Sequence, residues 1–259
     1  MSYSTIIVTD DKAVRTITLN RPESRNATTP EMQTELISAM EDASASACAV
    51  VVFRGAGVAF CSGLDLAALQ AMKGKQETEY QADAERIAQL FRSLYELPKP
   101  TIAAVHGAAI AGGTGLATIC DFTLATPSAK FGYTEARIGF VPALVSAYLA
   151  LQVGDKRSRD ILMTGRFFDA AEAYRLGLVN EIVPAEDLDA RVQELASVLE
   201  ANSPESLAAT KQLMAAQNRA WLDKAISEAM KANAQARSTT DFAEGITAFL
   251  EKRKPVWKR

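Results

Sequence analysis

Short apolar segments alternate with longer helix-like segments in the first half of the chain, and this alternation most constrains the fold. Residues 49–53 and 101–105 are continuous apolar runs of strand length, which is typical of strands buried on both faces. Thr29-Pro30-Glu31 predicts a helix start, and residues 77–97 read as a long helix that ends before Pro98. The pattern predicts an α/β fold with a largely parallel sheet covered by helices.

The two ends of the chain differ from this pattern. Residues 4–9 and 13–19 are rich in β-branched residues and flank a short turn, so they predict a β-hairpin. Strand signals become sparse after about residue 154, and helices are expected over residues 186–200, 204–217, 221–236 and 241–252. We therefore divide the chain into a core, residues 1–200, and a C-terminal helical region, residues 201–259.

Composition and charge exclude several classes of protein. The 259 residues carry a net charge of −3, without the basic footprint of a nucleic-acid binder. No apolar run approaches the roughly 20 residues that span a membrane, and residues 1–10 lack a signal-peptide pattern. Cys48, Cys61 and Cys120 fit neither a metal site nor a disulfide framework. We expect a cytoplasmic protein with free thiols, no metal and no nucleic-acid partner.

Two glycine-rich loops, residues 55–66 (the first loop) and 106–116 (the second loop), are candidates for a functional site. Each follows a predicted buried strand and precedes a helix, an arrangement that presents backbone N–H groups and a positive helix terminus. Two such amides directed at one carbonyl oxygen form an oxyanion hole. Taken alone, each loop is weak evidence, and a tight turn is the favoured interpretation. A dinucleotide fingerprint starting at Gly55 fails, because Phe60 stands where its third glycine is required.

Two titratable side chains are candidates for catalysis. Glu135 lies among apolar and aromatic residues, where desolvation is expected to raise its pKa and suit it to proton transfer near neutral pH. The competing interpretation is a surface glutamate or an ion pair with Arg137. The sole histidine, His106, lies between a predicted buried strand and a glycine turn, and no G-x-S-x-G sequence is present. A structural role is therefore favoured for His106.

Taken together, these segments resemble the crotonase superfamily, the enoyl-CoA hydratase/isomerase family. The resemblance rests on residues 19–27 (LNRPESRNA), 60–65 (FCSGLD), 104–113 (AVHGAAIAGG), 120–121, 131–139, 162–179 and 244–253, in this order. It spans nearly the whole chain. It implies a crotonase-like spiral of ββα repeats with a C-terminal helical trimerisation region, in a homotrimer or a hexamer that pairs two trimers.

The resemblance also implies a site for an acyl-CoA thioester. The backbone N–H groups of Leu64 and Gly112 would hold the thioester oxygen, and Glu135 would act as acid and base. Enolate charge gathers on that oxygen, so fixed amides stabilise the transition state more than the ground state.

The same resemblance implies the contacts to coenzyme A. Ser62 would lie near the adenine, Arg25 would border the phosphates, and Lys252, from a neighbouring subunit, would lie near the ribose phosphate. Asp65, Leu66 and Gly113 complete the expected substrate-binding residues. The resemblance implies no metal and no redox cofactor. Coenzyme A is part of the substrate.

One position departs from the family pattern. Hydratases of the family typically use two glutamates, and Gly115 occupies the position of the second one. The favoured function is an enoyl-CoA hydratase, a lyase that adds water across the 2,3 double bond of a 2-enoyl-CoA. The alternatives are a 3,2-enoyl-CoA isomerase using Glu135 alone, another crotonase reaction such as hydrolysis, and a non-catalytic acyl-CoA-binding protein. Residues 69–90 and 140–149 are expected to line the acyl pocket.

Overall fold

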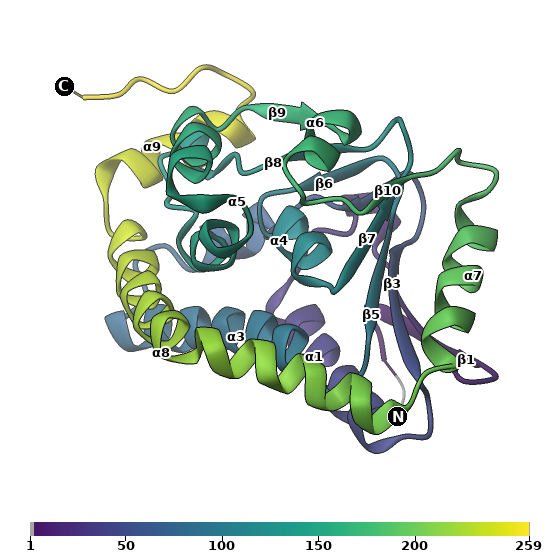
Figure 1. The fold of residues 1–259 in the computed structure, drawn as a ribbon. Helices are drawn as coiled ribbons and strands as arrows, with labels where there is room; N and C mark the ends of the chain where they lie inside the picture. The colour runs from purple at the N-terminus through teal and green to yellow at the C-terminus, as the bar shows by residue number, and fades with distance from the viewer. Residues whose placement is uncertain (1–2, 259) are drawn as a thin grey trace.

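Two β-sheets form the centre of the computed structural model, which describes residues 3–258 (Figure 1). The larger sheet has the order β1 (Ile6–Asp11), β2 (Val14–Leu19), β3 (Val50–Gly55), β5 (Thr101–Val105), β7 (Phe122–Ala125) and β10 (Glu181–Ile182). The smaller sheet has the order β4 (Ala59–Cys61), β6 (Ala108–Ile110), β8 (Lys130–Gly132) and β9 (Phe167–Asp169). Only the β1–β2 hairpin and the β8–β9 pair are antiparallel among the described strands.

The chain passes repeatedly from the larger sheet to the smaller sheet and then into a helix. β3 leads to β4 and then to α2 (Leu66–Ala71) and α3 (Glu77–Glu96). β5 leads to β6 and α4 (Gly112–Ile119), and β7 leads to β8, the short helix η2 (Glu135–Ile138) and α5 (Ala143–Thr164). This repetition confirms the predicted spiral of ββα units.

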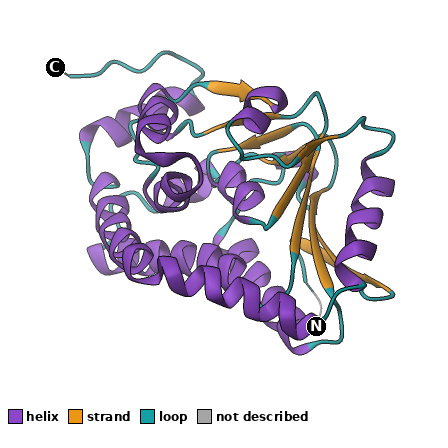
Figure 2. Ribbon diagram, in the orientation of Figure 1, coloured by secondary structure: helices purple, strands orange, loops and turns teal. Residues whose placement is uncertain are grey.

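The central strands β3 and β5 of the larger sheet are buried on both faces, which explains why most of their residues are apolar. One face, including Val50, Val52 and Ile102, packs against α7 (Leu188–Glu200). The opposite face, including Val51 and Phe53, belongs to the core shared with α1 (Pro30–Ala45) and α3. Figure 2 shows α7 alone on one side and the other long helices gathered on the other.

The C-terminal helices are built against this core. The two helices predicted over residues 204–217 and 221–236 are one continuous helix, α8 (Pro204–Ala236), because the intervening Asn-Arg-Ala contains neither proline nor glycine. α8 packs against α3 and α5, and α9 (Thr240–Leu250) packs against η2. Three shorter helices complete the described elements: η1 (Pro22–Ser24), α6 (Ala170–Arg175) and α2. The division of the chain at residue 200 stays a prediction.

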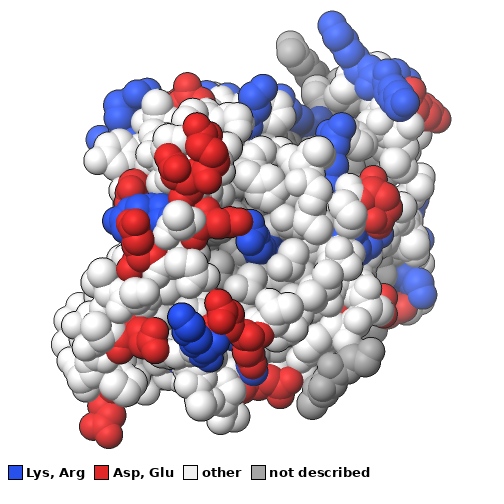
Figure 3. Space-filling model, turned by 90° about the vertical axis from the view of Figure 1, so that its right-hand side faces the viewer, with Lys and Arg blue, Asp and Glu red and all other residues white. Residues whose placement is uncertain are grey.

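The surface carries charges of both signs. On the face shown in Figure 3, acidic and basic side chains are scattered among uncharged residues. No helix within residues 3–258 is long and apolar enough to cross a membrane.

Candidate active site

A largely apolar cavity of about 300 Å³ connects the two glycine-rich loops with Glu135. Leu64 and Leu66 line it from the first loop, and Ala111 and Gly112 line it from the second. Side chains of α3, α5 and η2 form a further part of the wall. Glu135 is the only acid among the described residues that line the cavity. The predicted loops and the predicted acid therefore meet at one cavity.

Two backbone N–H groups at this cavity have no acceptor. Neither Leu64 N nor Gly112 N donates a hydrogen bond to any described residue, whereas the flanking Asp65 N donates to Thr28 O at 3.0 Å. The loops also touch, since a Cβ atom added to Gly63 would lie 3.5 Å from Gly112 N. Two unpaired donors on touching loops are the arrangement that an oxyanion hole requires.

A strained residue sets the direction of one of these donors. Ala111 has φ 55° and ψ −124°, a conformation that costs a non-glycine residue about 1–3 kcal/mol. Its N–H is held by Gly132 O of β8 at 2.6 Å, and its ψ angle fixes the orientation of the Gly112 N–H at the start of α4. The unpaired N–H is therefore built into the junction between β6 and α4.

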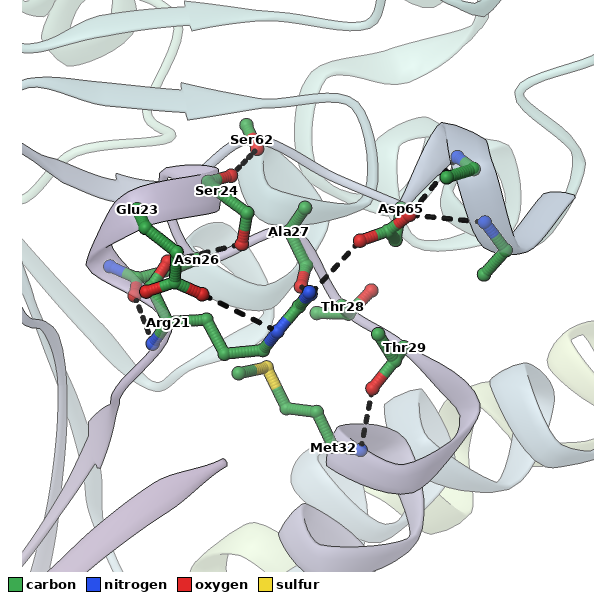
Figure 4. A network of polar contacts seen from close by, with 12 residues as sticks. Arg21, Glu23, Ser24, Asn26, Ala27, Thr28, Thr29, Met32, Ser62 and Asp65 are labelled. Atoms are coloured by element: carbon green, nitrogen blue, oxygen red, sulfur yellow. Dashed lines mark hydrogen bonds and ion pairs between the residues drawn. The ribbon is translucent and has the colours of Figure 1, made fainter. Parts of the chain in front are cut away.

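The first loop is fixed by an ion pair and a helix cap (Figure 4). Asp65 accepts hydrogen bonds from the N–H groups of Ala67 and Ala68, both at 3.0 Å, and so caps α2. Its other oxygen lies 3.0 Å from Arg21 Nη1. Asp65 does not line the cavity, so in this structure its carboxylate positions the backbone of Leu64.

Glycines 113 and 115 are required by close packing. A Cβ atom on Gly113 would lie 2.3 Å from Cys61 O, so α4 rests directly on β4 at this residue, which does not line the cavity. A Cβ atom on Gly115 would lie 2.5 Å from Val145 Cγ1 and 3.4 Å from Phe91 Cε1. Apolar side chains of α5 and α3 therefore occupy the space that a second acid would need.

Glu135 lies at the start of η2, directly after β8 and its loop. Burial raises the pKa of its carboxyl group from 4.5 to about 7. Its Oε2 atom is buried and has no hydrogen-bond partner among the described residues. Arg137 does not pair with it, because the Arg137 guanidinium lies 4.6 Å from the centroid of the Phe167 ring. A partly protonated carboxyl group facing an apolar cavity can both accept and deliver a proton at neutral pH.

The other predicted residues are distributed around this centre. Arg25, with φ 53°, and Ser62, whose hydroxyl donates to Ser24 O at 3.2 Å, both line the cavity. Lys252 is exposed beyond α9 and does not line the cavity of its own chain. His106 Nε2 lies 2.9 Å from Gly57 O and ties the second loop to the first.

The cysteines do not contribute to the cavity. Cys61 and Cys120 are buried and Cys48 is half-buried, all three as free thiols. Burial raises the pKa of the Cys61 thiol to about 12, so this thiol is uncharged at neutral pH.

Two amide side chains at the cavity were not predicted from the sequence. Gln33 of α1 and Asn233 of α8 line it and are almost completely buried. Their positions on helices resemble ordinary polar positions, so the sequence held no signal that singled them out.

Comparison with known proteins places this cavity in context. Residues 9–259 match the enoyl-CoA hydratase/isomerase family. A protein of Thermus thermophilus whose name assigns it to the enoyl-CoA hydratases is 43% identical over 93% of this chain and 96% of its own length. A crotonyl-CoA hydratase of Syntrophomonas wolfei is 32% identical, with 98% of each chain covered. The crystal structure of an enoyl-CoA hydratase/isomerase from Xanthobacter autotrophicus superposes with a TM-score of 0.90 at 32% identity, covering 96% of this chain and 94% of its own.

Proposed function

This chain belongs to the enoyl-CoA hydratase/isomerase family, and we propose that it hydrates 2-enoyl-CoA thioesters with Glu135 as its single catalytic carboxylate. The observation that carries the proposal is the meeting of three groups at one cavity: the raised-pKa carboxyl of Glu135 and the unpaired N–H groups of Leu64 and Gly112. Relatives that carry the name hydratase support the addition of water as the reaction.

The proposed mechanism uses one water molecule and these three groups. The thioester oxygen accepts hydrogen bonds from Leu64 N–H and Gly112 N–H. The Glu135 carboxylate takes a proton from water while the water oxygen bonds to carbon 3, and the π electrons move onto the thioester oxygen as an enolate. The enolate then reforms the carbonyl as carbon 2 takes the proton from Glu135. Charge on the oxygen is largest in the enolate, so the two amides stabilise it more than the substrate.

The proposal extends to how the substrate is held. Arg25 and Ser62 at the cavity would contact coenzyme A, and Leu66 would border the acyl group. Asp65 and Gly113 would act by fixing the two loops.

In a trimer or hexamer, Lys252 would reach the ribose phosphate of the coenzyme A that is bound to a neighbouring subunit. Apolar side chains exposed on α8 and α9, including Leu213, Trp221 and Phe249, give such an assembly a surface to bury. The proposal includes no metal and no separate cofactor, and it takes the enzyme to act in the cytoplasm.

Isomerisation is the second candidate, and the single acid favours it. With Gly115 packed against Val145, Glu135 is the only acid among the described lining residues that could move a proton from carbon 2 to carbon 4 of a 3-enoyl-CoA. This reaction needs no positioned water and passes through a dienolate whose charge gathers on the same thioester oxygen.

Ultraviolet absorbance of the conjugated enoyl thioester distinguishes the candidates. The purified protein is given a short 2-enoyl-CoA and, in parallel, a short 3-enoyl-CoA. Hydration predicts loss of the signal from the 2-enoyl substrate. A rise from the 3-enoyl substrate with a stable 2-enoyl signal would contradict hydration and establish the isomerase. A non-catalytic binder would change neither signal and would not exchange the protons at carbon 2 with solvent.

A further inference from the structure

A buried polar cluster stands behind one wall of the cavity, apart from the catalytic residues. Gln33 and Asn233, which are 2% and 3% exposed, line the cavity from α1 and α8. Behind them lie Asp83 and Arg86 of α3 and Arg237 at the end of α8. In Figure 1 α1 and α3 lie below α4, and α8 rises at the side towards its C-terminal end. The cluster comes from α1, α3 and α8, whereas the catalytic acid comes from η2.

The arginines fix the orientation of both amide side chains. Arg86 Nε donates to Gln33 Oε1 at 3.0 Å, and Arg237 Nε donates to Asn233 Oδ1 at 3.2 Å. A guanidinium only donates, so the amide oxygens must face the arginines and the NH₂ groups must face away from them. Neither amide nitrogen donates a hydrogen bond to another residue among residues 3–258. The cavity wall thus presents two amide groups as donors.

The cluster carries more positive than negative charge. Asp83 accepts hydrogen bonds from both Arg86 and Arg237, and within residues 3–258 no other acid pairs with either arginine. One carboxylate facing two guanidinium groups leaves a net charge of about +1. Arg237 is 95% buried, since its exposure is 5%, and its Nη1 has no partner among the described residues.

This charge lies next to the cavity. The Arg237 guanidinium is 5.7 Å from the ring centroid of Phe140, and Phe140 lines the cavity. A hydrocarbon chain filling this region would leave the two amide NH₂ groups without an acceptor and the net positive charge of the cluster without a counter-charge. Each buried unpaired polar group costs about 1–3 kcal/mol. An anionic group here would accept from both amides and offset the charge.

We infer that the acyl pocket contains a subsite, formed by Gln33 and Asn233 and backed by Arg237, for an acyl group that ends in a carboxylate. The inference rests on the proposed function, because it takes the ligand to be an acyl-CoA. It assigns a substrate class to the cavity: thioesters of coenzyme A with dicarboxylic acids.

Binding of two unreactive saturated thioesters tests the subsite apart from the chemistry. Glutaryl-CoA and pentanoyl-CoA have acyl chains of equal length and differ in the terminal carboxylate. Isothermal titration calorimetry of the full-length protein should give at least about tenfold tighter binding of glutaryl-CoA. Equal or tighter binding of pentanoyl-CoA would overturn the subsite and leave the proposed function standing. Failure to bind either thioester would overturn both.

Isosteric variants test whether Gln33 and Asn233 cause the preference for glutaryl-CoA. Asn233→Asp keeps the oxygen that accepts from Arg237 and replaces the donor with an anionic oxygen, so glutaryl-CoA should bind at least about tenfold more weakly and pentanoyl-CoA equally well. Gln33→Glu should act in the same way through Arg86, and it tests the same point if the first variant does not fold. The control is Gln235→Glu, which adds the same charge at an exposed position of α8 and should change neither affinity. A parallel loss of both ligands in a folded subsite variant would contradict the subsite.

Discussion

Glu135 has its unusual pKa because the side chain is surrounded by protein and its Oε2 atom finds no donor among the described residues. The first step of hydration requires the carboxylate form. We therefore expect kcat/KM for a 2-enoyl-CoA to rise with pH, pass its midpoint near pH 7 and then level off. A pH–rate profile of the wild-type protein measures this directly. A midpoint near pH 4.5 would show that burial does not control the titration of this group.

The same burial makes stability depend on pH. The folded-state pKa of Glu135, about 7, lies above its ordinary value of 4.5, so between these values the folded protein binds the proton more tightly. The contribution of Glu135 to the free energy of unfolding is therefore fully present below pH 4.5 and is lost as pH rises to 7. Relative to Glu135→Gln, the wild-type free energy of unfolding should fall by about 3 kcal/mol across this window, because one pKa unit corresponds to about 1.4 kcal/mol. Urea unfolding of both proteins at pH 5 and pH 8 measures the difference, and a constant difference would contradict it.

The Gly112 N–H can be removed without changing a side-chain function. Gly112→Pro lacks this donor, and we expect kcat for hydration to fall by about 10²–10³. Gly112→Ala keeps the N–H and serves as the control, because its Cβ would meet only Phe91 Cζ, at an ordinary 3.8 Å. Steady-state kinetics of both variants, with thermal melting to confirm folding, measure the effect. Near wild-type kcat in folded Gly112→Pro would remove this amide from the mechanism.

At the scale of elements, the contact between α4 and α5 explains the absence of a second acid. A glutamate at position 115 would meet Val145 at its first side-chain atom. We therefore expect Gly115→Glu alone to lower the melting temperature and give no gain in hydration. The double variant Gly115→Glu/Val145→Ala makes room on α5 and should hydrate faster than Val145→Ala alone. Melting curves and initial hydration rates of the three variants test this, and equal rates in the double variant and its control would show that the site is arranged around one acid.

The strands β1, β2, β3 and β5 of the larger sheet could be predicted, and the strands of the smaller sheet could not. Burial on both faces makes β3 and β5 continuously apolar, and this pattern is visible in the sequence. β4, β6, β8 and β9 have only three residues each, too short for any periodicity. β6 lies inside the second loop, where alanine and glycine hide it. The long helix α8 was divided in the prediction although no breaking residue separates its halves.

At the scale of the whole molecule, the loops and the acid could be predicted because their chemistry is local. Glycine clusters after buried strands and a glutamate among aromatic residues are visible in the chain. The surroundings of the site depend on contacts between distant residues. Arg21 meets Asp65 across 44 positions, and Arg237 meets Asp83 across 154. The sequence alone could therefore not show that Asp65 fixes a loop or that Gln33 and Asn233 present donors to the cavity.

The fold as a whole brings the two loops and η2 to one cavity, and the central claim is that a single carboxylate there performs the chemistry. Glu135→Gln keeps the size of the side chain and removes its ability to exchange a proton. Hydration of a 2-enoyl-CoA and affinity for a saturated acyl-CoA should be measured on this variant and the wild type together. We expect a loss of about 10²–10⁴ in kcat with affinity changed less than about threefold. Wild-type turnover in the folded variant would contradict it.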